Sequence, residues 1–315
     1  MPPQSRAPVH AFAHEAMATA FEIFVAGKER TYAGQAARAA FDEIDRLERL
    51  LTRFDPSSET SRIGRLGPGE SLRIGLETAE ILGLAAFVQT ETGGAFDVNY
   101  RGPARAGGRT RRSRPRPLTH LLAVAAAGRG FELTRLRARG REPLPAVDLD
   151  LGAVGKGYDL DAALAVLRDW NVGNALLHAG TSTVLASGPG PSTDGGRGWP
   201  VGAGTTISAG PGRVLLRDRA LSGSGTEVKG AHIVDPRTDR PAAGHAAAWA
   251  SHPSAAASDA LSTAFMVMSM EEVANFCGRH PAIWALVKTG AKKCRIFNAG
   301  ALAEKRSPRT RRRRP

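Results

Sequence analysis

The sequence has 315 residues, of which 42% are hydrophobic and 23% are charged, and its formal net charge is +13. This composition is close to the globular average and excludes a collagen-like or mostly disordered chain. The charge is regional, because residues 101–141 carry +11 and residues 301–315 carry +6, which leaves −4 for the rest. The basic runs at 101–117 and 301–315 contain no aromatic residue that could stack on a base, so we expect no nucleic-acid partner.

Membrane and export signals are weak in this sequence. No stretch approaches the roughly 18 uncharged apolar residues of a membrane span. Residues 1–19 contain neither an apolar core of signal-peptide length nor a Cys that could carry a lipid. Cys277 and Cys294 are too few for a disulfide framework, and we interpret them as structural thiols in a reducing compartment. We therefore expect no transmembrane segment and a cytoplasmic location.

The first half of the chain mixes helical and strand-like patterns. Apolar side chains recur every three or four residues in 33–53, which predicts a helix that Asp55-Pro56 ends. The patterns predict, in order, a loose lead-in at residues 1–16, a strand at 21–25, helices at 33–53 and 78–90, a flexible Arg-rich surface loop at 101–117, a short helix at 118–127 and a strand at 133–141.

The second half continues this mixture. The predicted elements are a helix at 158–170, an apolar β-rich stretch at 175–186, short strands at 199–203, 213–217 and 231–234, a helix at 258–277 and a last strand at 283–288. Helices and strands interleave without a regular βαβ period, which favours an α+β fold over a doubly wound parallel sheet.

A Gly-rich segment at 150–157 leads from an expected strand into a helix. It ends in Lys156-Gly157, so backbone N–H groups, a helix N-terminus and one ammonium group could meet a phosphate there. The spacing matches neither a Walker A loop nor the dinucleotide-binding glycine pattern. A Gly-rich connector with one surface Lys remains the alternative interpretation.

The segment at 258–264 places Asp259 and Thr263 four residues apart, on one face of the predicted helix. Two oxygen ligands at this spacing are suited to a hard cation such as Mg²⁺. Alternatively, Ser258 or Asp259 caps the helix, and the Thr263 hydroxyl bonds to its own helix.

Two further segments have both a structural and a functional interpretation. His232 lies in the predicted strand at 231–234 and could act as a general base near neutral pH, or could be structural. Gly93-Gly94 would end the preceding helix, or would let the backbone approach a flat ligand beside Phe96 and Asp97.

In this order, the segments resemble the ApbE family, whose members are FAD:protein FMN transferases. The resemblance extends from about residue 17 to 288, and its matching segments are 17–21, 51–62, 92–97, 150–157, 224–225, 232–238 and 258–264. It implies an α+β fold with two α/β subdomains that meet at a flavin-binding cleft. The domain would span 17–298 and include the Arg-rich loop, with a basic disordered tail at 299–315.

The resemblance also implies an activity and its residues. Such enzymes transfer FMN from FAD to a Thr or Ser hydroxyl of a target flavoprotein, depend on Mg²⁺ and release AMP. Lys156 would lie near phosphate, and His232 would be the base. Contacts to FAD would come from Met17, Phe54, Ala95, Phe96, Asp97, Asp150, Lys156 and Ile233, and Mg²⁺ ligands from the Ala153 carbonyl, Asp259 and Thr263.

The sequence departs from the family pattern in several places. Phe54 stands where the family usually has Tyr or Trp, and the Arg-rich run 101–116 replaces a Gly-Pro and aromatic segment. Residues 178–183 replace an Asp-Ile-Gly-Gly-Glu segment, and the connection from Gly225 to His232 is short. Two alternatives therefore accompany the transferase: a Mg²⁺-dependent FAD pyrophosphatase, or a flavin-binding relative without transferase activity.

Overall fold

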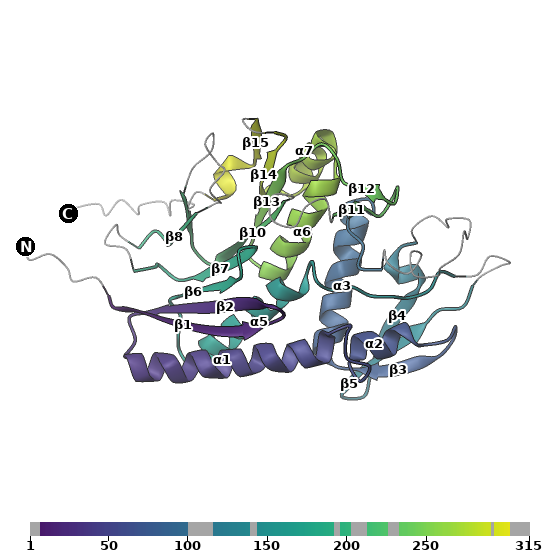
Figure 1. Ribbon diagram of the computed structural model, residues 1–315, viewed down its shortest axis with the longest axis horizontal. Helices are drawn as coiled ribbons and strands as arrows, with labels where there is room; N and C mark the ends of the chain where they lie inside the picture. The colour runs from purple at the N-terminus through teal and green to yellow at the C-terminus, as the bar shows by residue number, and fades with distance from the viewer. Residues whose placement is uncertain are drawn as a thin grey trace, which may run out of the picture.

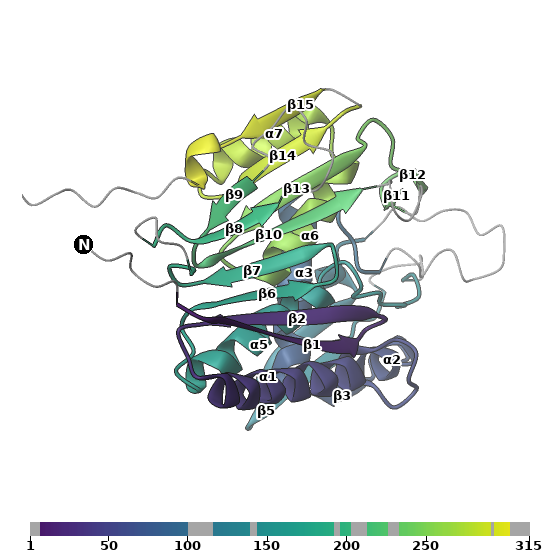
Figure 2. The same ribbon diagram turned by 60° about the vertical axis from the view of Figure 1, so that its left-hand side comes forward.

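The computed structural model describes residues 7–99, 116–138, 144–191, 196–202, 213–225, 233–290 and 293–302. Its largest element is an eight-stranded sheet with the strand order β1-β2-β6-β7-β10-β13-β14-β15 (Figure 1, Figure 2). Every neighbouring pair is antiparallel. The strands are β1 (Val9–Ala16), β2 (Thr19–Ala26), β6 (Ala175–Ala179), β7 (Thr183–Ser187), β10 (Arg219–Gly225), β13 (Ala247–His252), β14 (Trp284–Lys288) and β15 (Cys294–Phe297).

Helices cover one face of this sheet. They are α1 (Arg30–Leu51), α5 (Gly155–Asp169), α6 (Ala255–Val267) and α7 (Met270–Arg279). Alternate strand residues such as Phe21, Leu177 and Ala250 point to this face and are buried among helix side chains. Helices α5 and α6 lie over the middle strands of the sheet and contact each other there (Figure 1).

A short hairpin contributes to the opposite face. Strands β8 (Trp199–Gly202) and β9 (Arg213–Leu216) pair with each other, and their apolar residues form a separate cluster with sheet residues such as Val184 and Leu221. The sheet is thus buried on both faces near its centre.

The other group of elements packs against α6 on the side away from the sheet (Figure 1). Its long helix is α3 (Leu76–Glu91), whose Ile81 and Ala85 share a core cluster with Ala260 and Ala264 of α6. The smaller elements are α2 (Glu59–Gly64), η1 (Leu118–His120) and an antiparallel sheet of order β3-β5-β4, made of β3 (Ser71–Ile74), β4 (Leu122–Ala127) and β5 (Gly130–Arg135).

Three small elements complete the described chain: β11 (Val234–Asp235), β12 (Arg240–Pro241) and η2 (Ala299–Ala301). The α+β prediction is confirmed. None of the helices in the described ranges is both long and apolar enough to cross a membrane.

Three element predictions are wrong, and a fourth is displaced, because the strand expected at 133–141 is β5 at Gly130–Arg135. Residues 9–16 form β1 rather than a loose lead-in, because half-buried His10, Phe12 and His14 face α1, with the His14 ring 5.1 Å from that of Phe41. The Ala-rich stretch 118–127 is a 3₁₀ turn followed by β4, because pairing with β5 overrides helix propensity. The helix expected at 258–277 is two helices.

The break between those two helices has a local cause. Met268 leaves the helical region with φ −68° and ψ 144°, and Ser269 then starts α7 with a capping box closed by Glu272. The apolar periodicity predicts one continuous helix, whereas the capping box at Ser269 marks a new helix start. The structure follows the capping box.

Candidate active site

The start of α5 lies against the start of α6. At Gly157, a Cβ atom would lie 2.2 Å from the Ala255 carbonyl oxygen, so only glycine allows this approach. Asp161 fixes the crossing from the α5 side, because its carboxylate accepts hydrogen bonds from the Ala255 and Ala256 N–H groups at 2.8 and 3.0 Å and from the Ser254 hydroxyl at 2.7 Å.

This crossing brings Lys156 and Asp259 together. Asp259 is 3% exposed, and its Oδ2 lies 3.6 Å from Lys156 Nζ and 3.3 Å from the Gly157 nitrogen that donates to it. Lys156 Nζ also donates to the Gly152 carbonyl at 2.8 Å. Burial raises the pKa of the Asp259 carboxyl, and the nearby ammonium group opposes that shift.

Hydroxyl groups surround the next turn of α6. Ser224 Oγ of β10 lies 3.2 Å from Thr263 Oγ1 and 2.8 Å from Ser262 Oγ. The N-cap of α6 is Ser254, so Asp259 lies inside the helix, and the alternative in which Ser258 or Asp259 is the cap is wrong. Asp259 and Thr263 thus stand four residues apart within α6.

The donor set fits a hard cation. The Ala153 carbonyl belongs to the turn before α5, so a carboxylate, a hydroxyl and a backbone carbonyl are the candidate ligands. Within the described ranges, no three His, Cys, Asp or Glu side chains gather as a metal site. A metal here would thus depend on one carboxylate, as is typical of Mg²⁺ that also contacts substrate phosphates.

The turn after α3 forms a second part of the site. Gly93 and Gly94 have φ of +60° and +80°, and they turn the chain into residues 95–97. Ala95 and Phe96 are 1% and 2% exposed and belong to the core, so the structure buries both residues rather than presenting them on a surface. Burial raises the pKa of Asp97 to about 6.

Residues 97–99 run beside the segment that leads to α5. The Asp150 N–H donates to the Val98 carbonyl at 2.7 Å, and the Asp148 N–H donates to Asn99 Oδ1 at 2.7 Å. This pairing places Asp97 and Asp150 on neighbouring segments.

Asp150 also meets a residue that the sequence patterns did not single out. Arg53 Nη1 donates to Asp150 Oδ2 at 3.0 Å, and the guanidinium carbon lies 5.4 Å from the Phe54 ring centroid. Phe54 is 86% exposed, so its ring face is open to a planar ligand. Arg53 and Phe54 border a cavity of about 350 Å³ that also reaches Ser61 and Arg65.

Met17 approaches the start of α5 from the β1–β2 turn. Met17 and Ala18 both have positive φ, +50° and +56°, as a two-residue hairpin turn of this kind requires. The Met17 methyl carbon lies 3.4 Å from where a Gly155 Cβ would be. A bulky residue in this backbone region is uncommon, and such residues concentrate at functional sites.

The remaining candidates lie partly within and partly outside the described chain. Ile233 is half-buried against the core, and its carbonyl accepts from the Ala242 N–H at 2.8 Å. His232 and most of the Arg-rich loop lie outside the described residues. In the 178–183 segment, His178 contacts Phe24 on the β8–β9 face of the sheet, whereas Thr183 is buried on the helix face.

The model of the ApbE family matches residues 17–287. This chain belongs to the ApbE family. A relative from Rhodobacter capsulatus named FAD:protein FMN transferase is 28% identical over 268 residues, which are 81% of this chain and 50% of that protein. The chain thus spans about half the length of the curated relative it matches.

Solved ApbE structures share the fold. The apo flavinyl transferase ApbE of Pseudomonas stutzeri superimposes with a TM-score of 0.72 at 20% identity, covering 93% of this chain and 96% of that one. The flavin transferase ApbE of Vibrio cholerae gives 0.71 at 18% identity, covering 94% and 99%. The apbe protein of Thermotoga maritima gives 0.72 at 21% identity, covering 92% and 97%.

The structure brings only some of the candidate residues of this ApbE chain into contact with one another. Lys156 and Asp259 are in contact, and Thr263 follows one helical turn later. Asp150 is tied to Arg53 rather than free. Sequence reasoning missed Arg53, and it also missed Asp159, a fully buried carboxyl in the helix predicted at 158–170. An acidic residue on the apolar side of that helix was the available signal.

Proposed function

We propose that this chain is a Mg²⁺-dependent flavin transferase, which moves FMN from FAD to a Thr or Ser hydroxyl of a target flavoprotein and releases AMP. The observation that carries the proposal is the contact between Lys156 and the buried Asp259 where α5 and α6 cross. Family membership and the name of the R. capsulatus relative support the same reaction class.

The proposal requires a cation, because a buried carboxylate would lie close to the negatively charged pyrophosphate of FAD. A buried carboxylate repels a pyrophosphate, and one ammonium group already shared with Asp259 offsets that repulsion only in part. The Ala153 carbonyl, Asp259 and Thr263 would hold Mg²⁺, whose oxygen preference they satisfy. When bound, the ion would neutralise charge that develops on the transferring phosphoryl group.

The chain's own residues would bind and orient FAD. Phe54 offers an exposed ring for stacking, and Asp97, Asp150 and Lys156 offer polar contacts at three neighbouring segments. Met17 and Ile233 would add apolar contacts. Because Arg53 holds Asp150 at 3.0 Å, FAD binding would have to share or displace this ion pair.

The reaction needs no nucleophile from this chain. The acceptor hydroxyl oxygen would form a bond to the FMN phosphorus, while the bond from that phosphorus to the bridging oxygen breaks and AMP leaves with this oxygen. His232, which lies outside the described residues, is proposed as the base that takes the hydroxyl proton.

Replacing Asp259 tests the metal assignment. We expect Asp259→Asn to lower Mg²⁺-dependent AMP release from FAD at least about 100-fold, because the one carboxylate ligand is lost. Asp42→Asn, at an exposed position of α1, is the matched control and should leave the rate unchanged. AMP is followed by chromatography at several Mg²⁺ concentrations. Full activity of Asp259→Asn would refute the metal site.

The acceptor decides between transfer and hydrolysis. The chain is incubated with FAD, Mg²⁺ and peptides that carry Thr or Ser, and peptide mass is measured. A mass gain equal to FMN together with AMP supports the transferase. AMP and free FMN without a labelled peptide would favour the pyrophosphatase. Binding of FAD without any turnover would leave a flavin-binding relative.

A further inference from the structure

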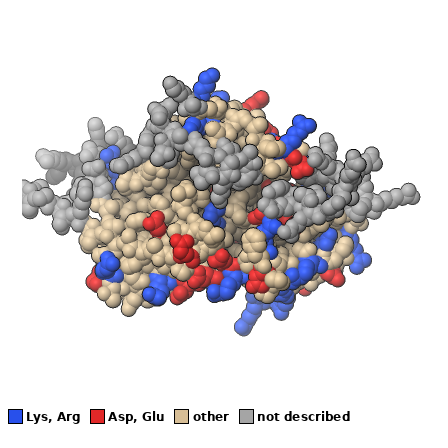
Figure 3. Space-filling view, viewed as in Figure 1, with Lys and Arg blue, Asp and Glu red and all other residues tan. Residues whose placement is uncertain are grey.

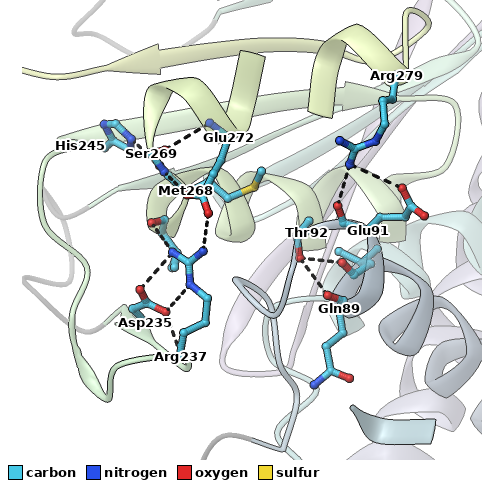
Figure 4. A network of polar contacts seen from close by, with 12 residues as sticks. Gln89, Glu91, Thr92, Asp235, Arg237, His245, Met268, Ser269, Glu272 and Arg279 are labelled. Atoms are coloured by element: carbon cyan, nitrogen blue, oxygen red, sulfur yellow. Dashed lines mark hydrogen bonds and ion pairs between the residues drawn. The ribbon is translucent and has the colours of Figure 1, made fainter. Parts of the chain in front are cut away.

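One arginine connects the β11–β12 hairpin to the end of α6 and the start of α7 (Figure 4). Arg237 binds its own hairpin through Asp235, with Nε 3.0 Å from Oδ1 and Nη2 3.1 Å from Oδ2. It reaches α7 through Nη1, which donates to Glu272 Oε1 at 2.7 Å. Nη2 also lies 3.4 Å from the Val267 carbonyl at the last residue of α6.

Glu272 is a fixed partner rather than a mobile surface side chain. Its second oxygen, Oε2, accepts the Ser269 N–H at 2.7 Å in the capping box of α7. Both carboxylate oxygens are thus occupied, one by the helix start and one by Arg237. A second contact fixes the same junction, because His245 Nε2 lies 2.7 Å from the Met268 carbonyl oxygen.

The other side of Arg237 faces the turn after α3. A Cβ atom on Gly94 would lie 3.7 Å from Arg237 Cγ, so the arginine stem is close to the backbone that leads into residues 95–97. At the other end of β11, Ile233 packs against the core cluster that contains Ala95 and Phe96. The hairpin and the turn therefore meet at Arg237.

We propose that Arg237 is a positioning residue of the flavin site. By pairing with Asp235 and Glu272 it would hold Ile233 and the 94–97 turn at a fixed separation. Its contact with the Val267 carbonyl would tie both to α6, the helix that carries Asp259. This inference rests on the proposed function, because it takes Ile233 and residues 95–97 as contacts of FAD. Arginine suits the task, since its planar fork can bind two carboxylates in set directions while lysine offers one point charge.

The test compares Arg237→Ala and Arg237→Lys with Arg240→Ala, an exposed arginine on β12 of the same hairpin. We expect Arg237→Ala to raise the KM and the Kd for FAD about tenfold or more. Its kcat per folded molecule should stay within about threefold of the wild type, because the metal ligands remain. Arg237→Lys should recover part of the affinity, and Arg240→Ala should match the wild type.

A second variant and a second readout keep the test independent of folding losses. Glu272→Gln retains an oxygen for the Ser269 N–H but loses the charge, so the rise in KM should be smaller and in the same direction. Hydrogen–deuterium exchange of the free protein should increase in both 92–97 and 233–241 in Arg237→Ala.

Each outcome has a separate meaning. An unchanged KM with a lower kcat and melting temperature would reduce Arg237 to a merely structural role and overturn the proposal. Exchange that rises only in 233–241 would also overturn it, because the two segments would not be coupled. If the wild type neither binds nor turns over FAD, the proposed function fails, while the exchange data still decide whether Arg237 couples the segments.

Discussion

At the scale of single residues, the most informative side chain is Asp159. It is fully buried on α5, and neither carboxylate oxygen has a hydrogen-bond partner among the residues that the structure describes. Burial raises its pKa well above the usual value, and the nearby Glu48 carboxylate adds to the shift. An acid whose pKa is higher in the folded state makes folding less favourable as pH rises, because the unfolded state ionises first.

This gives the first prediction at the residue scale. As the pH rises above about 4, where the unfolded Asp ionises, the free energy of unfolding should fall more steeply for the wild type than for Asp159→Asn. The variant should be the more stable protein at neutral pH, because an amide does not ionise and so avoids the cost of a buried carboxylate charge. Urea unfolding at several pH values measures this, with Asp42→Asn as the exposed control. Parallel pH profiles for the two proteins would contradict it.

Ala18 gives the second prediction at this scale. Its φ of +56° is unfavourable for a residue with a Cβ atom, and the turn type demands it. Ala18→Gly should therefore stabilise the protein by up to about 1 kcal/mol. Ala13→Gly, at an exposed position of β1 without a positive φ, should instead destabilise it by roughly 0.5–1 kcal/mol. Melting temperatures of the two variants should thus move in opposite directions.

At the scale of elements, the site depends on how α5 and α6 cross. Gly157→Ala would force its Cβ into the Ala255 carbonyl, 2.2 Å away, so the helices must separate. We expect a loss of about 1–3 kcal/mol of stability from overpacking. Mg²⁺-dependent turnover should fall further than stability explains, because Lys156 and Asp259 move apart.

A glycine in α3 provides the control for this variant. Among the described residues, no side chain or neighbouring element lies within 4 Å of where a Gly83 Cβ atom would be. Gly83→Ala should therefore stabilise the protein by up to about 1 kcal/mol. Urea unfolding and FAD turnover are measured for both variants. Normal turnover in Gly157→Ala would show that the close crossing is not needed for the site.

Sequence patterns predicted elements better where one signal dominated. The periodic apolar face of α1 was expected at 33–53 and occurs at Arg30–Leu51. Residues 118–127 and 258–277 carried two competing signals, and there the strand pairing and the capping box decided. At the site, resemblance selected Lys156 and Asp259, but no local pattern could predict that Arg53 would hold Asp150 from 97 positions away.

At the scale of the whole molecule, the net charge of +13 misrepresents the folded body. Lys and Arg side chains are interspersed with Asp and Glu over α1, at the lower edge of the view in Figure 3. The densest basic runs, in 101–115 and 303–315, lie outside the described residues. The candidate site instead uses three acids, Asp97, Asp150 and Asp259, at the junction of the two groups of elements.

The pairing of β2 with β6 has a consequence for synthesis of the protein. Phe21 is opposite Ala179, so the β1–β2 hairpin gains its sheet neighbour only after about 150 further residues have been made. At roughly 5–20 residues per second, the open strand edge waits for about 8–30 s. Asp259 is made later than Ala179, so its contact with Lys156 forms only after the residues that close this edge have been synthesised. Until then, the unpaired edge of β2 exposes backbone N–H and C=O groups with which another strand could pair.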